Sequence, residues 1–130
     1  MGQQQLLLII LGVIIVGIAI AVGLSLFSAN SVQANKDACI NDINNLAANA
    51  YQFYIRPTSM AGGGGTYVGY TIPFKMSSND NATYVASAQS TTNCTFTATS
   101  HTNNGTVIGS VDQTGKVSFD ASTGFTGDFK

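Results

Sequence analysis

The stretch Leu6–Phe27, LLLIILGVIIVGIAIAVGLSLF, decides the fold of this chain. It carries no charge, and its strongest polar group is the hydroxyl of Ser25. At about 1.5 Å of rise per residue, a helix of this length spans roughly 33 Å, the hydrocarbon thickness of a bilayer. Its apolar residues surround the whole helix, so no face is left for water. The stretch is therefore predicted to lie in lipid, or in a protein interior that replaces lipid.

The composition limits the chain to one domain beside this stretch. The chain has 130 residues and a formal net charge of −1, and residues 1–35 contain no ionisable side chain. Without a basic patch, nucleic acid is not an expected partner. A secretory signal would have a basic start, a shorter apolar core and a small-residue cleavage site. These features are missing, so we interpret the apolar stretch as retained.

The helical pattern continues beyond Phe27. Apolar residues from Val32 onward recur at spacings of three and four, while Asn, Asp and Lys occupy the positions between them. No Pro or Gly interrupts the run before Arg56-Pro57, where the residue preceding a proline disfavours helical geometry. We therefore expect one helix over residues 1–56, with a membrane or filament-core segment at 6–27 and an amphipathic half at 28–56.

Residues 57–130 are expected to form a small antiparallel β domain that packs on the amphipathic half-helix. Alternating apolar and polar residues, bounded by turn residues, predict its strands. The expected strands are Val68–Phe74, Thr83–Ser90, Cys94–Thr99, Val107–Val111 and Lys116–Ala121. The tail after Ser122, with its two phenylalanines, is expected to fold back onto the sheet. The predicted fold class is α+β, with one long N-terminal helix and a sheet of four to five strands.

Two kinds of covalent chemistry are suggested by the sequence. Cys39 and Cys94 both lie beyond the apolar stretch, and an even number of cysteines outside a membrane favours a disulfide, here between helix and sheet. The alternative is two unpaired buried thiols. Three Asn-X-Thr motifs make Asn81, Asn93 and Asn104 possible glycosylation sites, if the cell modifies such motifs.

This architecture, a long helix with an apolar first half and an amphipathic second half carrying a small β domain, resembles a type IV pilin of a divergent bacterial or archaeal type. The resemblance implies a precursor anchored in the cytoplasmic membrane, a prepilin peptidase and assembly machinery as partners, and an extracellular filament of identical subunits. It also implies that the apolar half-helices pack together in the filament core. That core would contain Leu6, Leu7, Leu8, Ile9, Ile10, Leu11, Gly12, Val13, Ile14, Ile15, Val16, Gly17, Ile18, Ile20, Val22, Gly23, Leu24, Leu26 and Phe27.

The mature start of the chain has two possible registers within this resemblance. Cleavage after Gly2 would make Gln3 the first residue. If Met1 is first instead, Gln5 occupies the place where bacterial pilins usually carry a glutamate. In that register Met1 and Gln5 are the predicted inter-subunit contact, with an amide oxygen available to a neighbour's terminal amine.

No catalytic chemistry is expected. His101, the single histidine, lies in a polar run without a second histidine or a glutamate to complete a metal site. The acidic residues do not follow a calcium-loop pattern, and Gly62–Gly65 lacks the Lys-Ser/Thr of a phosphate-binding loop. The serines and threonines have no base to activate them. The expectation is therefore a non-enzymatic protein with no catalytic, metal or cofactor site and no small-molecule substrate.

Three functions fit these observations. The first is a structural subunit, the major pilin of a filament used for adhesion or surface motility. The second is a minor pseudopilin of a secretion or uptake machine. The third is a single-pass, membrane-anchored β domain that binds a partner, which a flexible linker after the apolar stretch would favour.

Overall fold

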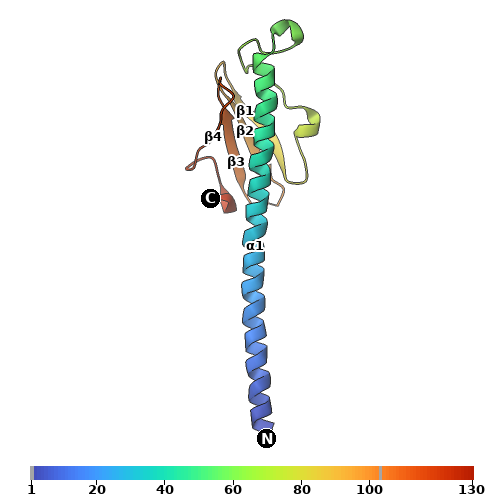
Figure 1. Cartoon of the computed structure of the whole chain (residues 1–130), viewed down its shortest axis with the longest axis vertical. Helices are drawn as coiled ribbons and strands as arrows, with labels where there is room; N and C mark the ends of the chain where they lie inside the picture. Colours follow the sequence, from blue (N-terminus) through green and yellow to red (C-terminus); the bar gives the residue numbers. More distant parts are fainter. Residues whose placement is uncertain (1, 103) are drawn as a thin grey trace. The chain divides into compact units, whose positions relative to one another are not determined.

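The computed structural model of the chain describes residues 2–102 and 104–130 and has an α+β fold (Figure 1). Helix α1 (Gly2–Ile55) is followed by one antiparallel sheet in the order β1-β2-β3-β4. The strands are β1 (Ala82–Gln89), β2 (Cys94–Ser100), β3 (Thr106–Val111) and β4 (Val117–Phe119). Short 3₁₀ helices are η1 (Thr58–Met60), η2 (Phe74–Met76) and η3 (Gly127–Phe129). The predicted fold class is confirmed, with four strands.

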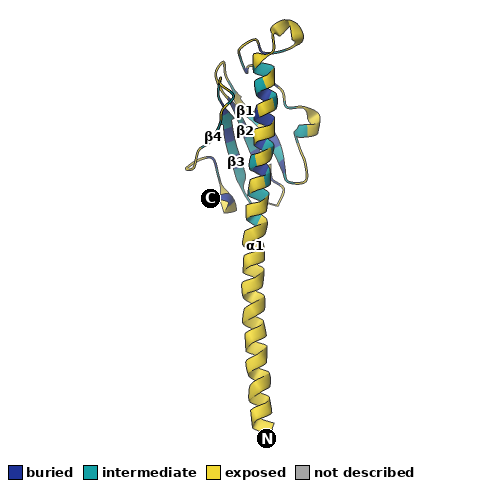
Figure 2. Cartoon of the chain, viewed as in Figure 1, coloured by how far each residue is buried: buried dark blue, intermediate teal, exposed yellow. Residues whose placement is uncertain are grey.

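The chain divides into two compact units, Met1–Gln33 and Ala34–Lys130. In the first unit the described residues are all helical, and all but the half-buried Val32 are exposed (Figure 2). The helix there is maintained by its own backbone hydrogen bonds and by the local preferences of its residues. Among residues 2–33, no side chain is buried and no apolar core forms.

The second unit has its core between α1 and one face of the sheet. The helix buries Cys39, Ile43, Leu46, Ala47 and Ala50, the three- and four-residue spacing that places side chains on one face. It ends at Ile55 as predicted. The Arg56 amide still donates to the Gln52 carbonyl at 3.1 Å, but Pro57 has no amide hydrogen to continue the pattern.

The sheet is made of consecutive hairpins, and its inner face alternates with an outer face rich in Thr and Ser. Phe96 and Ala98 of β2 are fully buried, as are Val107 and Val111 of β3. Gly109 lies between them, where an added Cβ would approach Ile43 Cγ2 to 2.9 Å and the Phe119 ring to 2.7 Å. A glycine at this position therefore lets the helix and the Phe119 ring come close to the sheet.

The C-terminal tail returns to the sheet, as predicted. Phe125 forms an isolated antiparallel bridge with Val107, and Phe129 is 1% exposed. The Lys36 ammonium lies 4.3 Å from the centre of the Phe125 ring, a cation–π contact between α1 and the tail. The tail thus covers the part of the core near the start of β3.

The predicted strand at Val68–Phe74 is wrong. Gly69 has a φ of 89°, outside the extended region, and the Tyr70 amide closes a turn on the Tyr67 carbonyl at 3.1 Å. Tyr67 and Tyr70 are buried, whereas Val68 is 55% exposed. The two tyrosines, three residues apart, attach an irregular segment to the core, so the alternation of apolar residues there does not mark a strand.

The predicted disulfide between Cys39 and Cys94 is also not present, because both cysteines are free and fully buried. Ser100 donates to Asn35 at 2.7 Å, and Ile43 lies over Gly109, the cross-strand partner of Phe96. Strand β2 therefore runs antiparallel to α1, which places Cys39 near Ala98. Cys94 lies four residues further along, roughly 13 Å of strand, whereas bridged Cα atoms lie roughly 4.4–6.8 Å apart.

Candidate assembly surface

The apolar side chains of the first unit form the most unusual surface of the molecule. We call the stretch Leu6–Phe27 of α1 the apolar segment. Its large aliphatic and aromatic side chains are between 52% exposed, at Ile14, and 73% exposed, at Phe27. Soluble monomers rarely expose apolar patches larger than a few hundred Å², and patches beyond that size mark interaction surfaces. The segment therefore requires a partner that excludes water.

Each residue predicted to lie in a filament core belongs to this surface and is exposed in the single chain. The helix is long and apolar enough to cross a membrane, with a mean hydropathy of 3.2 over its most apolar window. Its length and composition would allow this helix to anchor the chain in a membrane.

The three glycines of the apolar segment have no role in packing within the chain. A Cβ added at Gly12, Gly17 or Gly23 would meet no atom within 4 Å. Glycine costs about 1 kcal/mol relative to alanine in a helix interior. Small residues let helix backbones approach one another closely in membranes. The three positions therefore leave room for another helix.

The predicted N-terminal contact is described only in part. Gln5 is helical and exposed. Met1, its predicted companion, lies outside the described residues. The Gln5 amide can donate and accept hydrogen bonds, so it can pair with a polar group of another molecule.

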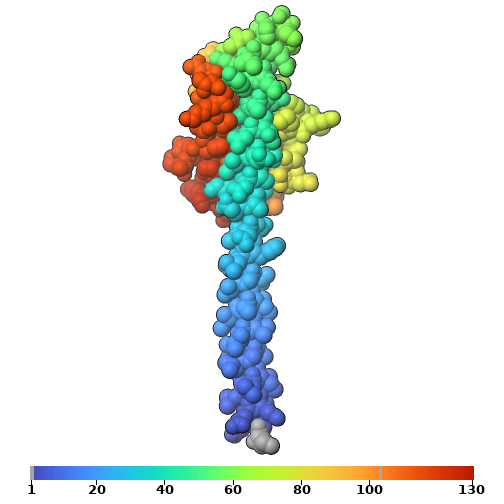
Figure 3. All heavy atoms as spheres, viewed as in Figure 1, coloured from blue at the N-terminus to red at the C-terminus, as the bar shows by residue number. Residues whose placement is uncertain are grey.

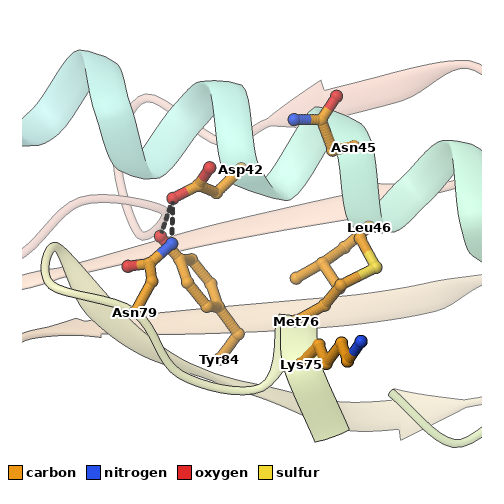
Figure 4. A pocket seen from close by; sticks show the side chains of 7 residues that line it. All are labelled: Asp42, Asn45, Leu46, Lys75, Met76, Asn79 and Tyr84. Carbon is orange, nitrogen blue, oxygen red and sulfur yellow. Dashed lines mark hydrogen bonds between the residues drawn. The ribbon is translucent and has the colours of Figure 1, made fainter. Parts of the chain in front are cut away.

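In the second unit, Asp42 joins the helix to the connector that precedes β1 (Figure 4). Its carboxylate accepts hydrogen bonds from the Tyr84 hydroxyl and from the Asn79 amide, the latter at 2.8 Å. Burial raises the pKa of Tyr84 above its ordinary value, and the hydrogen bond to Asp42 and the nearby negative charge raise it further. Tyr84 therefore stays protonated and keeps donating. We call this arrangement the Asp42 cluster.

A hollow of about 190 Å³ adjoins the Asp42 cluster, lined also by Asn45, Leu46, Lys75 and Met76 (Figure 4). The Asp42 carboxylate there already accepts two hydrogen bonds, from Asn79 and Tyr84. These hydrogen bonds fasten Asn79 of the connector and Tyr84 of β1 to α1.

The tyrosines near the end of α1 belong to the core. The Tyr67 ring packs against the tilted Tyr54 ring with ring centres 4.6 Å apart, and its hydroxyl donates to the Asp112 carbonyl at 2.6 Å. Tyr70 donates to Asn49 Oδ1 at 2.7 Å. Burial is the main cause that raises the pKa of Tyr67 and of Tyr70 to about 12. These side chains are therefore neutral packing groups.

The two cysteines are likewise buried, and burial raises the pKa of each thiol. The pKa of Cys94 rises to about 11. A thiol that stays protonated is a poor nucleophile and a poor metal ligand. Both side chains therefore act as small apolar residues of the core.

His101 lies on the surface, with Nε2 3.5 Å from Ser78 Oγ and 3.4 Å from Thr83 Oγ1. Within residues 2–102 and 104–130, no group of three His, Cys, Asp or Glu side chains is placed to hold a metal ion. Asp112 and Asp120 accept hydrogen bonds from their own turns, and these bonds lower the pKa of Asp120 to about 2. Their carboxylates stabilise the turns.

The three glycosylation motifs occupy different surroundings. Asn93 is exposed in the turn between β1 and β2, while Asn81 and Asn104 are half-buried. The Asn81 carbonyl accepts a hydrogen bond from the Asn35 amide at 3.3 Å. The sequence alone could not rank the three motifs, because exposure depends on the turn in which each one falls.

One exposed feature was not found from the sequence. Phe74 is 92% exposed in η2, directly after Pro73. The segment around it, yellow in Figure 3, protrudes beside the part of α1 that belongs to the same unit. The alternation that predicted a strand over Val68–Phe74 did not indicate that Phe74 is exposed.

Comparison with known proteins finds no family model, no curated protein and no solved structure that matches the chain.

Proposed function

We propose that the chain is the structural subunit of an extracellular filament of the type IV pilus kind. Copies would polymerise through the apolar segment, with the second unit forming the filament exterior. The single observation that carries this proposal is that the apolar side chains of Leu6–Phe27 are exposed around the whole helix in the part of the chain that the structure describes.

The apolar segment supplies the driving force for such assembly. Burying a Val, Leu, Ile or Phe side chain that would otherwise face water is worth about 1.5–3 kcal/mol. Because the segment has no charge, neither lipid nor a bundle of identical helices would have to accommodate a buried ion. The same segment can therefore rest in a membrane before assembly and among its copies afterwards.

Release from lipid requires contacts between helices that lipid cannot match. Lipid chains are as apolar as leucine, so helices associate through close packing and hydrogen bonds. The open space over Gly12, Gly17 and Gly23 permits such packing. Gln5 adds an amide that can form hydrogen bonds between neighbouring subunits.

The continuity of α1 favours a subunit over an anchored binding module. The helix runs from Gly2 to Ile55, and from Cys39 it forms part of the core of the second unit. A module that reaches for a partner above a membrane would gain from a flexible linker. Among the described residues of the second unit, no group of three His, Cys, Asp or Glu side chains is placed to hold a metal ion.

A single-pass anchored β domain is the second candidate, supported by the ability of α1 to cross a membrane. A minor pseudopilin of a secretion or uptake machine is a variant of the first, and abundance separates the two. Shearing the cell surface and analysing the released material by electron microscopy and mass spectrometry tests all three.

Thin, regular filaments composed mainly of this chain are the expected result. Filaments that contain the chain only as a trace component would identify it as a minor subunit. Retention of the whole pool in the membrane fraction, with no filament containing it, would contradict the proposal and leave the anchored domain.

A further inference from the structure

The three Asn-X-Thr motifs differ in whether the folded domain leaves them available. The motif needs an asparagine amide as acceptor and a hydroxyl two residues later. Asn93 is the only one of the three acceptors that is exposed rather than half-buried. Exposure alone therefore favours Asn93.

The hydroxyl of the third residue gives a second, independent distinction. In the Asn104 motif, the Thr106 hydroxyl lies 2.7 Å from the Thr126 hydroxyl. In the Asn81 motif, the Thr83 hydroxyl lies 3.4 Å from His101 Nε2. Thr95, of the Asn93 motif, is paired within the sheet through its backbone, and its carbonyl also accepts from the Ser87 hydroxyl at 3.4 Å. Its hydroxyl makes no hydrogen bond within the described part of the chain.

The local fold also presents Asn93 in a defined turn. The Ser90 hydroxyl accepts from the Asn93 amide nitrogen at 2.9 Å, and the Ser90 amide donates to the Asn93 carbonyl at 2.8 Å. The backbone of Asn93 is thus fixed, while its side chain is directed by no hydrogen bond of the described residues. Cys94, the middle residue of the motif, is buried and anchors the start of β2.

The positions of the three motifs within the second unit also distinguish Asn93 from the other two. The Ser90–Asn93 turn lies near the end of α1, because the Ser90 carbonyl accepts from Tyr67 and the Tyr67 ring packs on Tyr54. The Asn81 and Asn104 motifs lie at the opposite end, beside Asn35, which contacts both Asn81 and Ser100. A bulky group at Asn93 would therefore lie at the other end of the second unit from Asn35.

We propose that Asn93 is the N-glycosylation site of this chain. The Asn93 Nδ2 atom attacks the anomeric carbon of a lipid-linked oligosaccharide, an N–C bond forms, and the C–O bond to the lipid phosphate breaks. The phosphate leaves with the electron pair, and the amide loses one proton to a base of the transferase. This inference rests on the extracellular position of the second unit in the proposed function.

The test is intact-mass and peptide mass spectrometry of the chain purified from its own host. The peptide containing Asn93 is expected to carry a glycan, whereas the peptides of Asn81 and Asn104 are expected to be unmodified. Asn93→Gln and Thr95→Ala should abolish the added mass, and Thr95→Ser should retain it. Thr97→Ala, on the same strand face but outside the motif, is the matched control and should retain it.

An unmodified Asn93 in the wild-type chain, or a glycan on Asn81 or Asn104 in its place, would overturn the inference. The wild-type result needs no variant to fold. Filaments with an unmodified Asn93 would refute glycosylation alone. A glycan at Asn93 on a chain that forms no filaments would refute the filament proposal and leave the site in place.

Discussion

The two units of this chain differ in whether their apolar side chains are buried within the unit or exposed. Ala34–Lys130 buries its apolar groups internally, with Phe96, Val107 and Ile43 fully covered. Residues 2–33 bury almost nothing and expose the most apolar sequence of the chain. A mutation in the core of the second unit should therefore lower the free energy of unfolding. A mutation in the apolar segment of the first unit should instead weaken association with other molecules.

The largest expected effect comes from a charge in the apolar segment. Gly17→Arg would place a cation where neither lipid nor a helix bundle can solvate it, so filaments should be absent by electron microscopy. The circular dichroism melting of the second unit should be unchanged in detergent. Gly17→Ala is the control for loss of the glycine alone. Normal filaments from the arginine variant would refute burial of this segment.

The next largest effect is expected from a cavity in the core of the second unit. Phe96 is fully buried and contacts the Tyr70 ring edge-on, so Phe96→Ala should lower the free energy of unfolding by about 3–5 kcal/mol. Leu11→Ala removes a side chain that is 54% exposed in the single chain and should leave this free energy unchanged. Denaturant titration of the full chain in detergent measures both. An equal loss of unfolding free energy in the two variants would contradict the difference in burial between the two units.

Alkaline pH should destabilise the second unit alone. The pKa of Tyr67 and Tyr70 is about 12 in the folded chain and 10 in the unfolded one, because burial favours the neutral phenol. The stability that each contributes is present below pH 10 and is lost as pH rises from 10 to 12, by up to about 2–3 kcal/mol.

The measurement is the unfolding midpoint between pH 8 and pH 12. Residues 1–35 have no ionisable side chain, so their helix content in detergent should not change over this range. A flat stability profile above pH 10 would show that the two tyrosines are not buried.

The smallest effect is expected at the Asp42 cluster. Tyr84→Phe removes the hydroxyl that donates to Asp42 and should cost about 1–2 kcal/mol. Tyr51→Phe removes a hydroxyl with no hydrogen bond among the described residues and serves as the control, expected within about 0.5 kcal/mol of wild type. Similar values for the two variants would mean that the cluster does not hold the connector.

The sequence was most informative where local pattern and environment agree. The end of α1 follows from Pro57, and strands β1 to β3 follow from alternation between turns. The apolar segment was recognisable from composition alone. The sequence could not name a partner for it, and the described residues leave it exposed.

The errors came from features that depend on packing across the domain. The alternation around Gly69 suggested a strand, but burial of Tyr67 and Tyr70 determines the path there. The disulfide was inferred from the even number of cysteines and from their places on the apolar faces of helix and sheet. The direction of β2 against α1 instead separates the two thiols. The Asp42 cluster joins residues 42, 79 and 84, a combination that no local spacing predicts.

The most direct test of the account is a helical reconstruction by electron cryomicroscopy of filaments released from the cell surface. We expect a core of packed α-helices into which Leu6–Phe27 of this chain can be built, with the sheet domain outside. Filaments whose core is built from another protein, or in which Leu6–Phe27 faces solvent, would contradict it.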